Sequence, residues 1–279
     1  MEPTYFIWDI SPEITSIGPI SLRWYSLCFM LSFLIGLFIM RKIFIKEGKN
    51  LADLDPLFIH MMLGTAIGAR LGHCLFYDPM YYLSNPLEIF KVWEGGLASH
   101  GGAIGILFSL WLYARKHKDQ PLMWVFDRLV IPAALGGFFI RLGNFFNSEI
   151  LGTPTDVPWA IIFKRFDMIP RHPTMLYESV GYLVIFVFLV QVYRHYDGKI
   201  PRGLTFGLYF LLIFGWRFYA EFYKVRQAAF GEDFFLSVGQ ILSIPAILMG
   251  AYFVYKAVWN PIIPAPAQTQ SRSSKKRRK

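Results

Sequence analysis

Long blocks of apolar residues set the strongest limit on how this chain can fold. The blocks are near the length of about 20 residues that crosses a ~30 Å hydrocarbon core as a helix. The 279 residues are 54% hydrophobic and only 17% charged, whereas a soluble domain carries about a quarter charged residues. The sequence therefore predicts an integral membrane protein with one membrane domain and no large soluble domain.

We expect an all-α fold with about seven transmembrane helices, because hydropathy marks seven blocks. They cover roughly 21–40, 56–77, 97–114, 122–140, 174–193, 203–222 and 238–257. Two segments between them are long: Tyr77–Gly96 is predicted as an interfacial arm, and a small head covers about 147–173. Within the head, Trp159–Phe163 is predicted as a strand. Residues 1–260 then form the membrane-embedded domain, and 261–279 a disordered basic tail.

The placement of positive charge predicts the orientation of the chain. Lysine and arginine are concentrated in the loops after the first, third and fifth predicted helices and in the tail. Cytoplasmic loops carry such an excess, so we expect the N-terminus outside, the C-terminus in the cytoplasm, and the arm and head outside the cytoplasm. The net charge of +9 is therefore explained by membrane topology, and we expect no nucleic-acid partner. The tail either contacts anionic lipid heads or only reinforces this topology.

The two cysteines, Cys28 and Cys74, each lie inside an apolar block. Free cysteine commonly behaves as a small buried hydrophobe, and the spacing fits neither a disulfide framework nor a metal site. The first ten residues lack the basic start and cleavage site of a signal peptide. We therefore expect the first apolar block to be retained, and no metal to be bound.

Polar residues from separate predicted helices fall at one depth near the outer membrane surface. Charged groups within spans are costly and generally functional. In the predicted topology this level holds Tyr25, His100, Arg141, Asn144, Asn147, Glu149, Arg217 and Glu221. Their convergence predicts a functional site.

Several of these residues also have structural interpretations. Arg217 and Glu221 are spaced for an ion pair within one helix. Arg141 could extend to the outer head groups, and Tyr25 suits the aromatic belt at the membrane surface. His100 could be a hydrogen-bonded packing residue.

Four further polar residues are candidates for the site or for structural roles. Arg70 lies in the middle of a predicted helix and needs a partner there, which would be a carboxylate or the site itself. His172, Tyr177 and Glu178 could cap the fifth helix, which we favour slightly, or line the site.

Two arginines at this depth suit a phosphate, because guanidinium stays charged and donates hydrogen bonds in a fork. A neutral histidine beside them could accept a proton, and asparagines and a glutamate could hold glycerol hydroxyls. These groups favour an enzyme that acts on a phospholipid with phosphate as the leaving group. The alternatives are a transporter or lipid-binding protein that holds an anion, and another lipid-head enzyme such as a phosphatase or acyltransferase.

At these residues the chain resembles the prolipoprotein diacylglyceryl transferase family. The matching segments follow the family's order and cover nearly the whole chain before the tail. They are Gly18-Pro19 with Trp24-Tyr25; Gly68-Ala-Arg-Leu-Gly72; Trp93-Glu-Gly-Gly96 with Ser99-His-Gly-Gly102; Arg141-Leu-Gly-Asn-Phe-Phe-Asn-Ser-Glu149 with Gly152; Arg171-His-Pro-Thr with Leu176-Tyr-Glu178; Arg217 with Glu221-Phe222; and Gly239-Gln-Ile-Leu-Ser-Ile-Pro245. One departure is Ile140, where the family's pattern has glycine before the arginine.

The resemblance implies transfer of the diacylglyceryl group of phosphatidylglycerol to the lipobox cysteine of a preprolipoprotein, with release of glycerol-1-phosphate, in the bacterial cytoplasmic (inner) membrane. It implies no cofactor; the partners are phosphatidylglycerol, preprolipoprotein signal peptides and membrane lipids. His100, Arg141 and Arg217 would be catalytic, with an arginine-assisted thiolate as the alternative to His100 as base. Arg141, Asn144, Glu149 and Arg217 would bind phosphatidylglycerol, and Tyr25, Arg70 and Glu221 would support the site.

Overall fold

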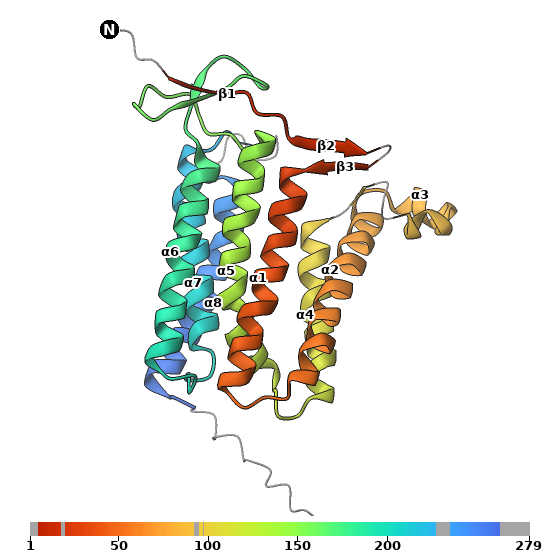
Figure 1. Cartoon of the computed structure of the whole chain (residues 1–279), viewed down its shortest axis with the longest axis vertical. Coiled ribbons are helices and arrows are strands. Elements are labelled where there is room, and N and C mark those ends of the chain that lie inside the picture. Colours follow the sequence, from red (N-terminus) through yellow and green to blue (C-terminus); the bar gives the residue numbers. More distant parts are fainter. Residues whose placement is uncertain (1–4, 18–19, 92–94, 97, 227–234, 263–279) are drawn as a thin grey trace, which may run out of the picture. The chain divides into compact units, whose positions relative to one another are not determined.

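The structure is a computed structural model that describes residues 5–17, 20–91, 95–96, 98–226 and 235–262. The chain divides into two compact units, one of residues 1–40 and 126–264 and one of residues 41–125 and 265–279. Helices predominate in both units (Figure 1). The predicted tail lies almost entirely outside the described residues.

Each of the seven predicted helical segments is a helix in the structure. These helices are α1 (Trp24–Lys46), α2 (Leu54–Phe76), α4 (Ser99–Lys116), α5 (Leu122–Asn147), α6 (Thr174–His195), α7 (Leu204–Ala220) and α8 (Val238–Trp259). Among the described residues, four of them, α1, α5, α6 and α8, are long and apolar enough to cross a membrane. The chain is therefore a mostly helical, multi-pass membrane protein.

In the first unit, α7 packs closely against α8 because both helices have glycine at the contact. A Cβ atom added to Gly207 would lie 2.9 Å from the Gly250 carbonyl oxygen, and one added to Gly250 would lie 2.8 Å from the Gly207 oxygen. Small residues at such contacts let helix backbones approach within a membrane. Helix α7 also packs against α6. It therefore contacts both α6 and α8 within the first unit.

Asp127, near the start of α5, joins α5 to the start of α7. Its fully buried carboxylate accepts hydrogen bonds from the backbone amides of Gly203 at 2.7 Å and Phe206 at 3.0 Å, and from the Thr205 hydroxyl at 3.0 Å. Amides at a helix start have no partner within the helix, so the carboxylate satisfies them. This contact holds one end of α7, and the other end carries Arg217.

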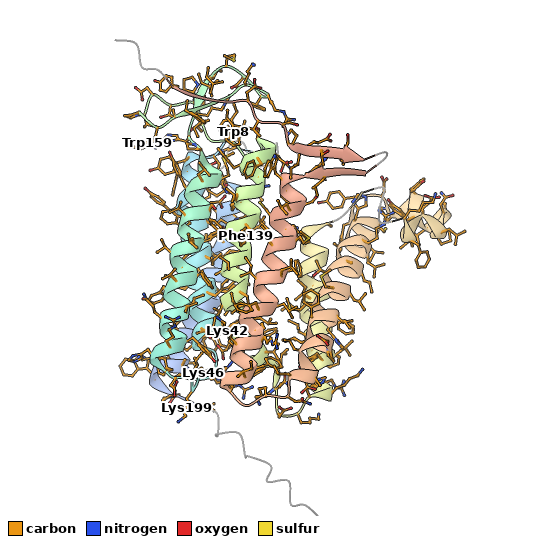
Figure 2. All side chains as sticks on the ribbon, in the orientation of Figure 1. Trp8, Lys42, Lys46, Phe139, Trp159 and Lys199 are labelled. Atoms are coloured by element: carbon orange, nitrogen blue, oxygen red, sulfur yellow. The ribbon has the colours of Figure 1, made fainter. Side chains whose placement is uncertain are left out.

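A small sheet covers the end of the first unit where α5 ends and α6 begins (Figure 1). Strand β4 (Ile161–Phe163) lies between β1 (Phe6–Trp8), which is parallel to it, and β5 (Pro170–Arg171), which is antiparallel. Trp8, Phe145 and Phe163 are buried beneath this sheet in one hydrophobic cluster. Figure 2 shows Trp8 and Trp159 at this end of the unit and Lys199 at the opposite end.

The strands add detail that the all-α prediction lacks. The strand predicted at Trp159–Phe163 is present at Ile161–Phe163, but its partner β1 comes from the N-terminus, outside the predicted head. A second sheet is the antiparallel hairpin of β2 (Glu13–Ile17) and β3 (Ile20–Arg23). Strands this short are not specified by local pattern alone, because pairing with distant segments stabilises them.

In the second unit, α2 and α4 pack through facing glycines. A Cβ atom added to Gly68 would lie 2.7 Å from the Gly105 Cα atom, and one added to Gly72 would lie 2.6 Å from the Gly101 Cα atom. After α2, the predicted arm contains the short helix α3 (Pro79–Ser84) and the 3-10 helix η2 (Pro86–Phe90). Its exposed side chains include Met80, Leu83 and Leu87.

Candidate active site

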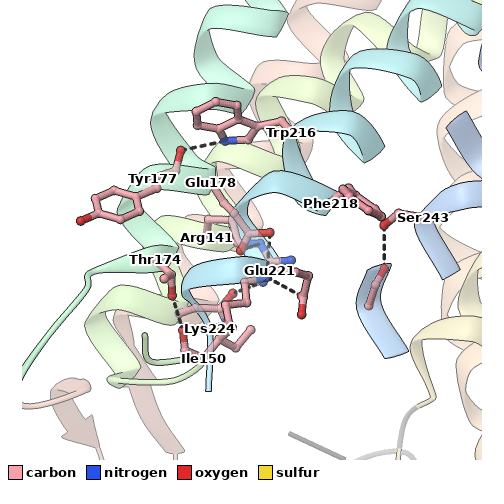
Figure 3. Close-up of polar contacts among 12 residues, drawn as sticks. Arg141, Ile150, Thr174, Tyr177, Glu178, Trp216, Phe218, Glu221, Lys224 and Ser243 are labelled. Atoms are coloured by element: carbon pink, nitrogen blue, oxygen red, sulfur yellow. Dashed lines mark hydrogen bonds and ion pairs between the residues drawn. The ribbon is translucent and has the colours of Figure 1, made fainter. Parts of the chain in front are cut away.

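The end of α5 and the start of α6 are joined by a buried ion pair. Arg141 Nε lies 3.1 Å from Glu178 Oε2, and the Glu178 side chain is fully buried. The Tyr182 hydroxyl, one turn further along α6, donates to the other Glu178 oxygen at 3.3 Å. Figure 3 shows Glu178 and Arg141 directed toward one another. A buried carboxylate needs such partners, because burial without them is costly.

Lys224 is the second cation beside Glu178. It follows the 3-10 helix η4 (Glu221–Tyr223) at the end of α7, and its side chain is only 4% exposed. Its Nζ lies 3.0 Å from Glu178 Oε1 and 2.9 Å from Glu221 Oε1. Sequence reasoning missed Lys224, because it counts there as one more charge in an outer loop. A lysine one helical turn after Glu221 is the only local signal.

The turn that ends α5 brings Asn144 and Glu149 together. Asn144 Nδ2 donates to Glu149 Oε2 at 3.0 Å, and Asn147 Nδ2 donates to Glu149 Oε1 at 3.1 Å. Arg141 Nη1 lies 3.4 Å from Asn144 Oδ1 and completes the chain of contacts. The Asn147 Oδ1 atom is buried without a hydrogen-bond partner among the described residues.

The backbone of this turn takes an uncommon conformation. Ser148 and Ile150 have φ angles of 55° and 59°, in the left-handed region that is costly for a branched residue such as isoleucine. The Thr174 hydroxyl donates to the Ile150 carbonyl at 2.9 Å and holds the turn against the start of α6. Tyr25, at the start of α1, packs against α5 at Gly143, where an added Cβ atom would lie 2.8 Å from its ring.

Arg217 differs from Arg141 because it has no counter-ion among the described residues. Within the part of the chain that the structure describes, its half-buried guanidinium makes no hydrogen bond or ion pair. The predicted pair with Glu221 is wrong: Glu221 instead contacts Lys224 at 2.9 Å and accepts from the Ser237 hydroxyl at 3.0 Å. Trp216, which precedes Arg217, donates from its indole Nε1 to the Tyr177 carbonyl at 3.0 Å, and Tyr177 precedes Glu178, the partner of Arg141. The two arginines thus share one neighbourhood.

Arg70 and His100 belong to the second unit. Arg70 is buried and donates to the carbonyls of Ile89 at 2.9 Å, Glu88 at 2.6 Å and Gly95 at 2.6 Å. Backbone oxygens of the arm are thus its partners among the described residues, and the carboxylate partner considered for it stays a prediction. His100 is exposed in the first turn of α4, and its role as a base stays a prediction.

His172 lies in an aromatic cavity of about 470 Å³ between the head, α6 and α7. Its Nδ1 atom lies 3.1 Å from the Tyr177 hydroxyl, which accepts a hydrogen bond from Trp159 Nε1 at 2.7 Å. Burial lowers the pKa of His172 below its usual value, so the imidazole is neutral near pH 7. The helix cap favoured for these residues is not seen, because the residue that caps α6 is Pro173 and no side chain caps it; Glu178 instead lies at the centre of the cluster around Arg141.

Together these features define a class: a multi-pass membrane protein with a cationic, partly uncompensated polar site where several helices end. A sequence model of one family, prolipoprotein diacylglyceryl transferase, matches residues 12–256. The chain belongs to this family.

Curated relatives extend the match over nearly their whole length. A phosphatidylglycerol–prolipoprotein diacylglyceryl transferase of Chloroherpeton thalassium is 53% identical over 91% of this chain and 95% of the relative. That of Tolumonas auensis is 47% identical over 87% and 94%, and that of Bacteroides fragilis is 40% identical over 89% and 94%.

Proposed function

We propose that this protein transfers the diacylglyceryl group of phosphatidylglycerol to the lipobox cysteine of preprolipoproteins, the first step of bacterial lipoprotein maturation. The observation that carries the proposal is the pair of arginines in one neighbourhood, of which Arg217 has no counter-ion among the described residues. Guanidinium groups bind phosphate through paired hydrogen bonds. The names of the relatives supply the matching lipid and protein substrates.

In the proposed reaction, Arg141 and Arg217 act on the leaving group. The cysteine sulfur attacks the carbon of the diacylglyceryl group that is bonded to the phosphate oxygen, that C–O bond breaks, a thioether C–S bond forms, and glycerol-1-phosphate departs. The phosphodiester has one negative charge, whereas the released monoester gains a second one. Arg141 and Arg217 would stabilise that developing charge, as preorganised donors do in other enzymes.

The remaining residues have supporting roles in this proposal. The thiol must lose its proton, because the thiolate is the nucleophile, and His100 is the proposed acceptor. Asn144 and Glu149, with the unpartnered Asn147 Oδ1 atom, would hold the glycerol hydroxyls of the head group. Tyr25 and Glu221 would orient the arginines, and Arg70 would position the arm.

The topology of the site follows from its substrates. We propose seven membrane spans with the N-terminus outside and the C-terminus in the cytoplasm, so that α5, α6 and α7 present the site at the outer face of the bacterial membrane. Both substrates are membrane-bound and would enter laterally, with the Tyr77–Gly96 arm as a gate. No nucleic acid takes part.

One assay tests the reaction. Purified protein is incubated with phosphatidylglycerol labelled in its acyl chains and a peptide with a lipobox cysteine. We expect label on the peptide thiol and release of glycerol-1-phosphate. Hydrolysis of the lipid without peptide labelling would indicate a phosphatase-type enzyme, and movement of unchanged lipid alone would indicate a transporter; either result would overturn the proposal.

A further inference from the structure

Lys224 is buried and lies between two carboxylates at the edge of the proposed phosphate site. Its ammonium contacts Glu178 at 3.0 Å and Glu221 at 2.9 Å (Figure 3). Lysine is rarely this buried unless it is paired. Lys224 is therefore unlike an ordinary loop lysine, whose charge lies in water, and its burial between Glu178 and Glu221 calls for an explanation.

The ion pairs of Lys224 are not needed to attach its segment to the rest of the protein, because backbone hydrogen bonds already hold that segment. The Thr153 amide donates to the Tyr223 carbonyl at 2.8 Å, and the Val225 amide donates to the Leu151 carbonyl at 3.2 Å. These bonds flank Lys224 on both sides and fix the segment against the turn after α5. An apolar side chain of similar length would occupy the same space without the cost of burying an ammonium group.

The charge balance around Glu178 gives Lys224 a function. Arg141 is the other cation at Glu178, 3.1 Å away, and it is also a proposed ligand of the phosphate. When Arg141 turns toward a phosphate, its contact with Glu178 weakens. Without Lys224, the buried carboxylate would then keep only the Tyr182 hydroxyl, and an uncompensated buried charge is strongly unfavourable.

We propose that Lys224 is a positioning residue for the anion site: it compensates Glu178 so that Arg141 is free to bind the lipid phosphate. The inference rests on the proposed function. It predicts that Lys224 acts on phosphate affinity through Glu178, without touching the lipid. If Lys224 served only to tie α6 to the segment after α7, loss of either partner of the ion pair would weaken the site equally.

The test compares Lys224→Met, Glu178→Gln, the double variant and Lys224→Arg. Two quantities are measured in mixed micelles: the apparent KM for phosphatidylglycerol and the inhibition constant of glycerol-1-phosphate. Lys224→Met should raise both by about tenfold or more, because it leaves Arg141 as the only cation at Glu178. Lys224→Arg should stay within about threefold of the parent protein, because it keeps the charge.

The double variant separates the two roles. If Lys224 compensates Glu178, neutralising Glu178 removes the need for it, so the double variant should recover a KM at least about threefold below that of Lys224→Met. A tether would not be rescued: both single variants and the double variant lose the same ion pair, so all three would be equally weak. Lys164→Met is the matched control, because Lys164 pairs with Asp9 on the exposed surface of the head; its KM should not change.

Two results would overturn the inference: an unchanged KM and inhibition constant in Lys224→Met, or a double variant as weak as Lys224→Met. Should Lys224→Met fail to accumulate in membranes, Glu178→Gln still decides, because a tether predicts a KM about tenfold above that of the parent protein in this variant and compensation does not. Transfer by the parent protein is measured first in the same assay. Its absence would contradict the proposed function, whereas its presence with no effect of Lys224 would contradict this inference alone.

Discussion

Glu178 organises the charges of the candidate site, although its sequence context suggested a helix cap. It is fully buried on α6 and receives Arg141, Lys224 and Tyr182 from three directions. One carboxylate thus fixes cations from two other elements. Arg217, by contrast, has no such partner in the described part of the chain and is the cation most available to an anion.

This difference makes Arg217 the most direct test of the site. Arg217→Ala should lower transfer by about 100-fold or more, because it removes charge stabilisation of the leaving phosphate. Arg217→Lys should fall between that variant and the parent protein, since lysine keeps the charge but loses the fork of donors. The measurement is kcat/KM for peptide labelling.

Membrane insertion of both variants should be normal, because no ion pair is lost. Arg165→Ala, at an exposed arginine of the head, is the control and should retain full activity. Full activity in Arg217→Ala would remove the residue from the proposed mechanism.

His172 predicts a specific dependence of stability on pH. Burial lowers the pKa of its imidazole below the ordinary value of 6.5, so the unfolded chain binds a proton at a pH where the folded protein does not. Stability should therefore be complete above about pH 6.5 and decrease as the pH falls below it. The edge of Tyr223 and the Tyr177 hydroxyl face the ring and supply no negative charge to offset this at that pH.

The measurement is the Tm in detergent between about pH 7.5 and about pH 5.5. His172→Gln should show a smaller decrease than the parent protein, because the titrating group is gone. The other histidines are present in both proteins and cancel in the comparison. An equal decrease in both would show that His172 does not contribute.

Contacts between helices in this protein depend on glycine where two backbones approach. The pair α2 and α4 meets through Gly72 and Gly101, and the pair α7 and α8 through Gly207 and Gly250. Lipid offers little hydrophobic drive for helices to associate, so close packing of backbones becomes the main source of attraction. The spacing of Gly68 and Gly72 is visible in the sequence, but only the structure identifies which helix they face.

Gly101→Ala should therefore destabilise the protein. An added Cβ atom would lie 2.7 Å from the Gly72 Cα atom, and such overpacking costs about 1–3 kcal/mol, which outweighs the higher helix propensity of alanine. Gly215→Ala is the matched control, because an added Cβ atom there has no neighbour within 4 Å. Unfolding by SDS should begin earlier only in Gly101→Ala; equal midpoints would contradict the close contact.

The molecule as a whole must expose the site to the side of the membrane where its substrates meet. Two exposed positions in the first unit report the orientation: Arg165 in the head and Lys199 after α6. Arg165→Cys should react with an impermeant maleimide from outside intact cells, whereas Lys199→Cys should react only after permeabilisation. Cys28 and Cys74 are buried and should stay unlabelled in the parent protein. Reversed labelling would contradict the proposed orientation.

Much of the architecture could be predicted from the sequence, because membrane helices obey simple rules of length and composition. All seven helical segments and the strand near Phe163 were predicted, as was the family. The pairing of β1 with β4 was not, since residues 6–8 and 161–163 are distant in sequence and strands of this length carry little signal of their own.

The sequence by itself determined the class of the protein, its helices and the residue types of the site, because apolar length and rare polar groups are local properties. Only the tertiary structure decided which charges meet: Glu178 with Arg141 and Lys224, Glu221 with Lys224 instead of Arg217, and Arg70 with the carbonyls of the arm. Ion pairing depends on atoms within about 4 Å, and residues far apart in the chain reach that distance only when the helices have packed.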